Sequence, residues 1–375
     1  MIEWLIVGGG VQGSHLARVL RVRMGVPADA LRIVDDAPAP LAAWDRRAAA
    51  CAMGYLRSPQ VHHIGLPAPD LRWYADSRGY DRAAFTAPYM RPSTSLFAAH
   101  SAAVVADEPS DLRLRDRVEA IESIDGGYRV IGRHGRWCSR RVLLAPGPPP
   151  LRRPGWAAGL AHVFDPDFDL SAAARPTVAV VGGGITAAQT ALAVARSGCM
   201  VDLVTRRFPR LADFDSAPCY AGPKCLGPFM ACGWHEKRRR ITRARNPGSL
   251  PRDVARALRR ARREGRIRVH AKAAVWLRDN GLRLEGGGHL VADEIVLATG
   301  FARGLPGGDL VRRVVRRFAL PLAPCGFPAL GDDLQWRAGL FLAGGLAELS
   351  LGPTAGNIRG ARLAGERLHR QGLLD

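Results

Sequence analysis

The sequence of 375 residues has only three lysines, no closely spaced pair of cysteines and no long apolar run. A helix that crosses a membrane needs about 20 consecutive apolar residues. No stretch approaches that length, so we expect no membrane span. No Cys-x-x-Cys motif occurs among the seven cysteines, which argues against a thiol–disulfide redox centre. The first residues, MIEWLIVGGG, include no basic leader, so we expect no secretory signal and a cytoplasmic protein.

Three of the cysteines, Cys219, Cys225 and Cys232, follow one another at spacings of six and seven residues. Closed zinc sites use tighter pairs. We therefore expect no metal and predict that the cysteines are reduced thiols in the core or in loops.

The segment around them, residues 213–240, is rich in glycine and proline and predicts a long loop. Loops of that length are usually functional or disordered. Two interpretations stay open: Lys224 and Trp234 close over a ligand, or the segment is a surface loop flanked by arginines.

The formal net charge is +20, and nearly all of the 54 basic residues are arginine. Such a skew is also what a GC-rich coding sequence produces. The densest run, residues 251–265, places Val254, Leu258 and Ala261 on one helical stripe with arginines around the rest, which predicts a solvated helix face. Nucleic-acid binding is therefore a weak alternative and we expect no nucleic-acid partner. The excess positive charge favours an anionic cofactor or substrate.

A glycine-rich turn opens the chain. A short apolar strand ending at Val7 runs into Gly8-x-Gly10-x-x-Gly13 and then into a helix. In such turns the three glycines permit the tight turn, the approach of a pyrophosphate to the backbone, and the packing of helix on strand. A second strand ends at Asp35, 22 residues past Gly13, where a carboxylate accepts hydrogen bonds from an adenosine ribose. The sequence predicts a dinucleotide site here.

The same pattern recurs at residues 176–198, as a strand, then Gly182-x-Gly184-x-x-Ala187, then a helix. A second nucleotide is therefore predicted.

The strand that follows this second turn ends in Thr205, Arg206 and Arg207 and has no acidic residue there. Guanidinium groups suit a 2′-phosphate through charge and bidentate geometry. We predict NADP(H) rather than NAD(H), with surface arginines of an arginine-rich protein as the alternative.

Two apolar strands end on small residues, VLLAPG at 142–147 and IVLATGF at 295–301. Gly147, Thr299 and Gly300 are predicted to lie close to bound nucleotide, at the points where the chain passes between domains. The predicted fold is α/β, with two Rossmann-like three-layer domains. Two such units in one chain suggest a flavin together with a nicotinamide. Residues 1–150 are predicted to form the first part of an FAD domain, 170–292 an inserted NADP(H) domain, and 293–375 the second part of the FAD domain.

The segment DEIVLATGF, residues 293–301, resembles the Asp-x3-Leu-Ala-Thr-Gly-aromatic motif of flavin-dependent N-hydroxylating monooxygenases, the lysine and ornithine N-hydroxylases. Residues 70–80 and 89–100 are similar to segments of the same family. The resemblance implies that NADPH reduces FAD, that O2 forms a C4a-hydroperoxyflavin, and that an amine nitrogen or a similar nucleophile of a small molecule is hydroxylated. A homo-oligomer is left open.

Other readings of the same fold also stay open. One is an NADPH-dependent flavin reductase or oxidase that passes electrons to another acceptor. Another is a non-catalytic flavin- or nucleotide-binding sensor, which intact glycine turns do not exclude.

Further candidate contacts to the cofactors lie in two segments. In residues 43–65, Trp44 is predicted to pack on adenine or sugar, and Arg57 and Ser58 to contact flavin or nicotinamide phosphate oxygens. His62 and His63 are the candidate catalytic residues, because histidine titrates near neutrality; the alternative is that one packs and the other binds a backbone carbonyl.

Near the C-terminus, the segment from Thr354 to Asn357 is predicted to present backbone N–H groups to the flavin pyrimidine edge. Gly345 stands where many related flavoproteins carry an aspartate that binds the ribityl chain. His162 is predicted to be structural.

Overall fold

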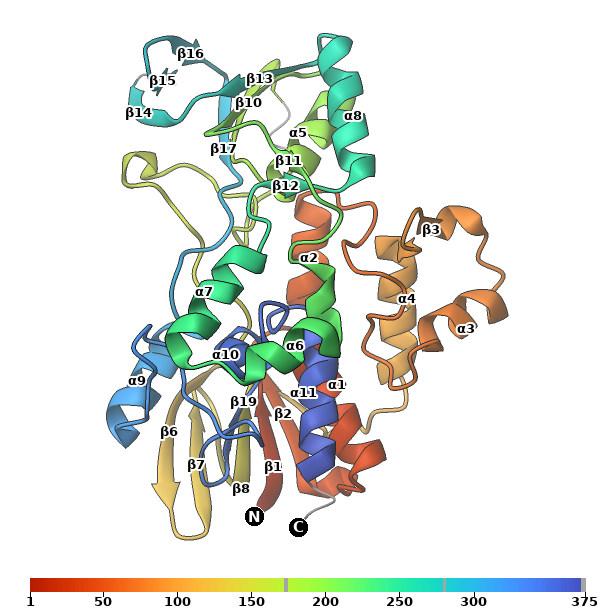
Figure 1. Ribbon diagram of the computed structural model, residues 1–375, viewed down its shortest axis with the longest axis vertical. Coiled ribbons are helices and arrows are strands. Elements are labelled where there is room, and N and C mark those ends of the chain that lie inside the picture. The colour runs from red at the N-terminus through yellow and green to blue at the C-terminus, as the bar shows by residue number, and fades with distance from the viewer. Residues whose placement is uncertain (172–174, 279–280, 372–375) are drawn as a thin grey trace.

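The computed structural model describes residues 1–171, 175–278 and 281–371. Its fold is mixed α/β, built on two parallel sheets (Figure 1). None of the helices in these described ranges is long and apolar enough to cross a membrane.

The first sheet gathers its strands from both ends of the chain. The path of hydrogen-bonded neighbours runs β18 (Gln335–Arg337), β19 (Leu340–Leu342), β8 (Arg136–Leu144), β1 (Ile2–Val7), β2 (Leu31–Asp35) and β5 (Arg113–Arg115). From β19 to β5 the neighbours are parallel. β6 (Val118–Ile124) and β7 (Gly127–Gly132) continue antiparallel from β8. The C-terminal strands therefore complete a sheet that the N-terminal residues begin.

Alternate residues of β1 point to opposite faces of this sheet. Both faces are buried under other elements. Trp4 and Ile6 pack with residues of α1 (Val11–Arg18) and α11 (Ile358–Gln371). Leu5 and Val7 pack with β6, β7 and α9 (Gly308–Phe318).

The second sheet is wholly parallel and is formed between β8 and β18 in the sequence. Its order is β13 (Ile267–Ala271), β10 (Met200–Thr205), β9 (Thr177–Val181) and β17 (Glu294–Leu297). One face packs on α5 (Ile185–Arg196) and α8 (Arg252–Arg263). The other face packs on the three-stranded antiparallel sheet of β14 (Ala274–Arg278), β15 (Gly281–Leu284) and β16 (His289–Val291).

The amphipathic helix predicted at 251–265 is confirmed as α8, whose buried residues are Val254, Leu258 and Ala261. The boundary at residue 293 needs correction. It assigned the strand before Ala-Thr-Gly to the first domain, but β17 pairs with β9 of the second sheet, and the chain leaves that sheet only after Leu297.

The remaining helices surround the two sheets. They are α2 (Ala42–Ala50), α3 (Asp70–Ser77), α4 (Thr94–Val105), α6 (Pro223–Met230), α7 (Trp234–Ala244) and α10 (Glu348–Leu351). Two short strand pairs join β3 (Phe85–Thr86) to β4 (Arg91–Pro92) and β11 (Arg210–Leu211) to β12 (Ser249–Leu250). In Figure 1, α3 and α4 form a projection on the right, beside α2.

The long loop predicted at 213–240 is instead mostly helical. α6 and α7 bury Phe229 and Ile241 in a cluster with Ala323 and Leu349, which belong to the C-terminal part of the chain. Figure 1 accordingly shows both helices near α10 and α11, away from the second sheet. The prediction of a loop was wrong because Gly222 and Gly233 cap the two helices and Pro223 starts α6, while α6 also accommodates Gly227 and Pro228.

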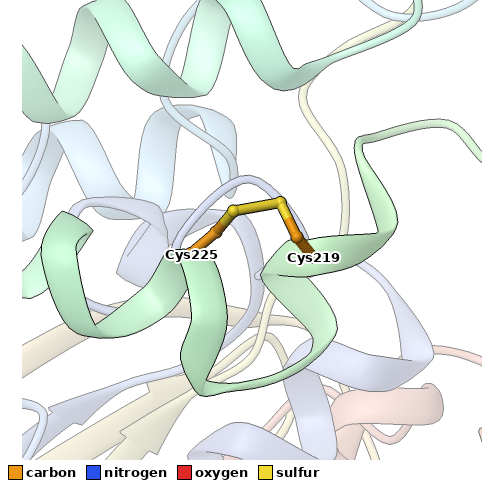
Figure 2. Close-up of a disulfide and its surroundings, with 2 residues drawn as sticks. All are labelled: Cys219 and Cys225. Atoms are coloured by element: carbon orange, nitrogen blue, oxygen red, sulfur yellow. A yellow bond between two sulfur atoms is a disulfide. The ribbon is translucent and has the colours of Figure 1, made fainter.

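The prediction of reduced cysteines is wrong for two of the seven. Cys219 and Cys225 form a disulfide at the start of α6 (Figure 2). The other five, Cys51, Cys138, Cys199, Cys232 and Cys325, are free thiols.

Candidate functional site

The three glycines of the first turn have three different surroundings. Gly8 has a φ of +106°, and a Cβ there would lie 2.2 Å from the carbonyl oxygen of Ala145. A Cβ on Gly13 would lie 1.8 Å from the carbonyl oxygen of Gly8, so α1 packs directly on the turn. A Cβ on Gly10 would meet nothing within 4 Å. Only Gly10 thus faces open space, where a pyrophosphate would approach the backbone.

Asp35, at the end of β2, accepts hydrogen bonds from the backbone N–H groups of Gly9 and of Ala37, the latter at 2.7 Å. The carboxylate therefore lies against the first glycine turn, and its contact with an adenosine ribose stays a prediction.

The second turn repeats this geometry. A Cβ on Gly182 would lie 2.2 Å from the carbonyl oxygen of Ala298, and a Cβ on Gly184 would meet nothing within 4 Å. Ala187 occupies the third position and is fully buried on α5. Ala145 and Ala298 are the alanines of the two small-residue strand ends. Those ends are small because each lies against the first glycine of a turn.

The two strand ends also meet each other. Arg152 N–H donates to the Gly300 carbonyl at 2.8 Å, Thr299 Oγ1 donates to the Arg152 carbonyl, and Leu151 forms a β-bridge with Phe301. Gly147 and Gly300 have φ angles of +81° and +75°. The segments that connect the two sheets therefore run side by side. Asp293 has a structural role in the motif, because it accepts hydrogen bonds from the N–H and the hydroxyl of Thr177 and holds β17 beside β9.

The two arginines at the end of β10 are exposed, and neither has an ion-pair partner within the ranges that the structure describes. Thr205 is buried, and its hydroxyl donates to the Arg207 carbonyl at 2.9 Å, which shapes this strand end. A Cβ on Gly183 would lie 2.4 Å from that hydroxyl oxygen, so the strand end lies against the second glycine turn. Arg206 and Arg207 thus lie next to the turn, and neither side chain is neutralised by an acidic group of the described residues.

Arg57 contacts backbone carbonyls and a serine, and its predicted contact with a phosphate oxygen stays a prediction. Its guanidinium donates to the carbonyls of Ala212, Asp213 and Phe214 and to Ser249 Oγ, at 2.7 to 3.3 Å. Burial lowers the pKa of Arg57. The side chain therefore ties the segment before α3 to the second half of the molecule. Ser58 beside it is half-buried.

The candidate catalytic histidines differ in their contacts. His63 is fully buried, and its Nε2 lies 2.9 Å from the carbonyl oxygen of Ala68, which matches the alternative of a histidine that binds the backbone. His62 is half-buried. Burial lowers the pKa of both to about 4, so both are neutral at physiological pH.

Trp44 lies on α2 with its ring 4.7 Å from that of Phe97, in the apolar cluster of α3 and α4. Its contact with adenine or sugar stays a prediction.

Of the two residues proposed as a lid, Lys224 is exposed on α6, and Trp234 packs against Lys237, whose Nζ lies 4.8 Å from the ring centroid. Both belong to helices packed on the C-terminal part of the chain, so the reading of this segment as a loop that closes is not supported.

His162 is structural, as predicted. It is buried, forms a β-bridge with Leu297, and its Nδ1 accepts from the Phe164 N–H at 3.1 Å.

The sequence analysis missed Gln12 and Arg47. The Gln12 side-chain amide donates to the carbonyls of Ala355 and Asn357 at 3.1 and 2.8 Å, which fixes the start of α11 beside the first turn. Arg47 lies over the ring of Phe301 at 5.6 Å. Gln12 had a detectable signal, because it lies inside the glycine motif; Arg47 is one arginine among many and had none.

The residues around the first turn fit a bound flavin nucleotide. Gln12 Oε1 and Thr354 Oγ1 are buried atoms with no hydrogen-bond partner in the described chain, and so is Arg47 Nε on α2, beside Phe301. Such atoms are rare in native proteins, because each costs about 1–3 kcal/mol, and a ligand is one way to satisfy them. A Cβ on Gly345 would lie 3.0 Å from Pro306 Cγ, so this site has little room for the aspartate of related flavoproteins.

A scan against protein-family models and a search of curated protein sequences both find no match. Solved structures do match. The cadaverine monooxygenase of desferrioxamine biosynthesis from Erwinia amylovora, solved with FAD, superposes with a TM-score of 0.78 at 14% identity over 100% of this chain and 95% of that one. The ornithine N-hydroxylase of Kutzneria sp. 744, solved with reduced FAD, NADP+ and L-ornithine, gives 0.77 at 17% over 100% and 99%.

The bacillithiol disulfide reductase of Staphylococcus aureus gives a TM-score of 0.67 at 13% identity over 100% of this chain and 98% of that one. At these identities the likeness establishes the fold. The chain thus has the fold that N-hydroxylating flavin monooxygenases share with other flavoproteins.

Proposed function

We propose that this protein is an FAD- and NADPH-dependent monooxygenase that hydroxylates an amine nitrogen of a small molecule, with O2 as co-substrate. The observation that carries the proposal is the repeated turn, in which Gly10 and Gly184 face open space at the carboxyl ends of two parallel sheets. Ligands of open α/β sheets bind at this end of the strands. The likeness to two N-hydroxylating monooxygenases over the whole chain supports the reaction class.

In this proposal the first turn, Asp35 and the segment from Thr354 to Asn357 hold FAD. The second turn, with Arg206 and Arg207, holds NADPH. The two domains are then Rossmann-like dinucleotide-binding units, the second inserted into the first. When bound, the flavin supplies electron transfer and oxygen activation.

The protein's own residues would bind and orient the cofactors and the substrate, and they would exclude water from the site. Neutral His62 and His63 are poor proton donors at physiological pH, since burial holds the pKa of each near 4. Arg47 of α2 packs over Phe301 and so brings a cation against the chain-crossing segment.

The test measures how NADPH oxidation by the FAD-loaded protein divides between hydroxylated product and peroxide. NADPH oxidation, peroxide release and hydroxylamine formation are measured with and without ornithine, lysine and cadaverine. Hydroxylamine in proportion to NADPH oxidised, with little peroxide, supports the proposal. Oxidation of NADPH with stoichiometric peroxide for every amine points to a reductase or oxidase, and failure of NADPH to reduce the flavin points to a sensor.

A further inference from the structure

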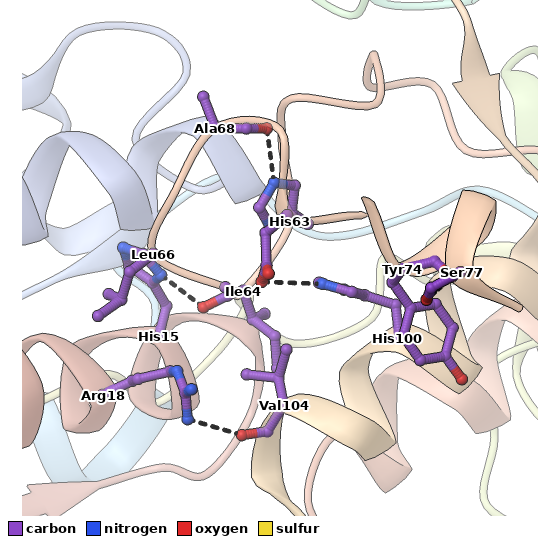
Figure 3. A network of polar contacts seen from close by, with 12 residues as sticks. His15, Arg18, His63, Ile64, Leu66, Ala68, Tyr74, Ser77, His100 and Val104 are labelled. Atoms are coloured by element: carbon purple, nitrogen blue, oxygen red, sulfur yellow. Dashed lines mark hydrogen bonds and ion pairs between the residues drawn. The ribbon is translucent and has the colours of Figure 1, made fainter. Parts of the chain in front are cut away.

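Three side chains from separate elements meet beneath the loop that precedes α3. His63 lies in that loop, Asp70 begins α3, and His100 lies on α4. The two imidazoles are 0% and 1% exposed. One nitrogen of each ring and one Asp70 carboxylate oxygen all lie within 4.8 Å of one another. The rings of His63 and His100, both labelled in Figure 3, meet edge to face with their centroids 5.0 Å apart.

The tautomer of His63 follows from its hydrogen bond. Nε2 lies 2.9 Å from the Ala68 carbonyl oxygen, as the dashed line in Figure 3 marks. A carbonyl can only accept, so Nε2 carries the proton and Nδ1 keeps its lone pair. Nδ1 is buried and has no partner among the described residues.

This lone pair shares its surroundings with a second acceptor. A Cβ on Gly65 would lie 1.8 Å from Asp70 Oδ2 and 3.2 Å from His63 Nδ1, so both atoms lie over the same glycine. His100 Nε2 lies 3.1 Å from Asp70 Oδ2. The other nitrogen of His100, Nδ1, is also buried without a partner. The unpartnered His63 Nδ1 beside this carboxylate requires an explanation, and His100 Nε2 brings a second imidazole to the same carboxylate.

We propose that His63 Nδ1, Asp70 Oδ2 and His100 Nε2 bind one Zn²⁺ ion. Two imidazoles and a carboxylate are a ligand set that zinc accepts, with water in the fourth position. The bond from His63 Nε2 to the Ala68 carbonyl is the outer contact that metal-bound histidines usually make. His100 then carries its proton on Nδ1.

The ion would join the loop, α3 and α4 at one point, in addition to the apolar packing that these elements share. Arg362 of α11 donates to the carbonyls of Gly65 and Leu66 at 2.6 and 2.9 Å, and His15 Nδ1 lies 2.8 Å from the Ile64 carbonyl oxygen. The zinc would fix the inner side of the same loop to α3 and α4. With His63, His100 and Gly65 buried, the ion would serve to hold these elements together.

The test begins with protein stripped by EDTA, desalted, and titrated with Zn²⁺ alone in a calorimeter. We expect one ion per chain. Asp70→Asn and His63→Gln should each weaken binding by at least the 10- to 100-fold that loss of an outer contact costs. Asp76→Asn removes the same charge from the exposed side of α3, and Cys232→Ser removes a free thiol; both should bind as the natural sequence does.

A second measurement does not depend on the variants folding. The ¹¹³Cd resonance of the cadmium-loaded protein should fall in the range of nitrogen and oxygen ligands. A resonance in the thiolate range, no binding at one ion per chain, or equal affinity in folded Asp70→Asn and His63→Gln proteins would overturn the proposal.

Discussion

At the scale of single residues, we expect opposite effects from alanine substitutions at two glycines of the first turn, one on FAD binding and the other on stability. Gly10→Ala adds a methyl group into open space at a φ of −72°, so the fold should tolerate it, while the pyrophosphate loses its close approach. Gly13→Ala would place the methyl 1.8 Å from the Gly8 carbonyl oxygen, which should lower the free energy of unfolding by about 1–3 kcal/mol. Fluorescence titration with FAD and urea unfolding of the FAD-free protein separate the two effects.

We expect Gly10→Ala to weaken FAD binding at least about 10-fold, which corresponds to about 1.4 kcal/mol, with an unchanged urea midpoint. If Gly10→Ala binds FAD as tightly as the natural sequence, the pyrophosphate does not lie at this turn.

The second prediction concerns Arg206 and Arg207 after β10 and the preference for NADPH over NADH. Changing Arg206 and Arg207 together to Ala should raise the KM for NADPH by about 10- to 100-fold and leave the KM for NADH unchanged. Each charge-assisted hydrogen bond to a phosphate contributes about 1.5–3 kcal/mol. Steady-state flavin reduction with both nucleotides measures the ratio.

The matched control is the pair Arg256→Ala and Arg259→Ala, which removes two exposed arginines from α8 in the same half of the molecule. An undiminished preference for NADPH in the Arg206, Arg207 double variant would show that these residues do not read the 2′-phosphate.

At the scale of elements, α7 is joined to the C-terminal segment by one buried carboxylate. Glu348, at the start of α10, accepts from Arg238 and Arg245, and its side chain is 3% exposed. Glu348→Ala leaves two cations facing each other without a partner. Removing one member of a buried pair costs about 3–5 kcal/mol.

We therefore expect Glu348→Ala to lower the free energy of unfolding by about 3–5 kcal/mol in urea, with faster amide exchange in α6 and α7. Glu236→Ala, which breaks ion pairs on the outer side of α7, is the control and should change the free energy by less than about 1 kcal/mol. Equal effects of the two changes would mean that α7 is not held by Glu348.

The sequence predicted the elements whose pattern is local. Both glycine turns, the strands that lead into them and α8 lie where spacing and periodicity placed them, because a turn conformation or an apolar stripe is encoded within about 20 residues. Arg57 and Glu348 could not be placed in this way. Their partners lie between 103 and 192 residues away along the chain. In an arginine-rich protein, nothing in the local sequence distinguishes an arginine that bonds to a distant segment from one that is solvated.

At the scale of the whole molecule, the crossing segments explain the position of β17. A strand that ends in Ala-Thr-Gly reads locally as the beginning of the returning domain. Its neighbour is decided by tertiary pairing, and β17 completes the second sheet beside β9 before Arg152 and Gly300 bring the two connections together. Membership of a sheet is a long-range property, which is why residue 293 was the wrong boundary.

The stability of the whole molecule should fall with acid, because buried histidines must be protonated on unfolding. Burial lowers the pKa of His15 to about 3 and the pKa of His162 to about 4, against about 6.5 in the unfolded chain. Below pH 6.5 the unfolded state therefore binds more protons than the folded state. The stability that depends on these neutral rings is complete above pH 6.5 and is lost as the pH falls toward 4.

Urea unfolding of metal-free protein between about pH 8 and pH 5 measures this loss. We expect a nearly constant free energy of unfolding above pH 7, and below pH 6 a decrease of about 1 kcal/mol per pH unit for each buried histidine. His162→Gln, which keeps a polar side chain beside the Phe164 N–H, should reduce that slope by the share of one histidine. His134→Gln, at an exposed position, should leave it unchanged. A free energy that does not change between pH 7 and pH 5 would mean that these rings titrate in the folded protein as they do in the unfolded chain, and hence that water reaches them.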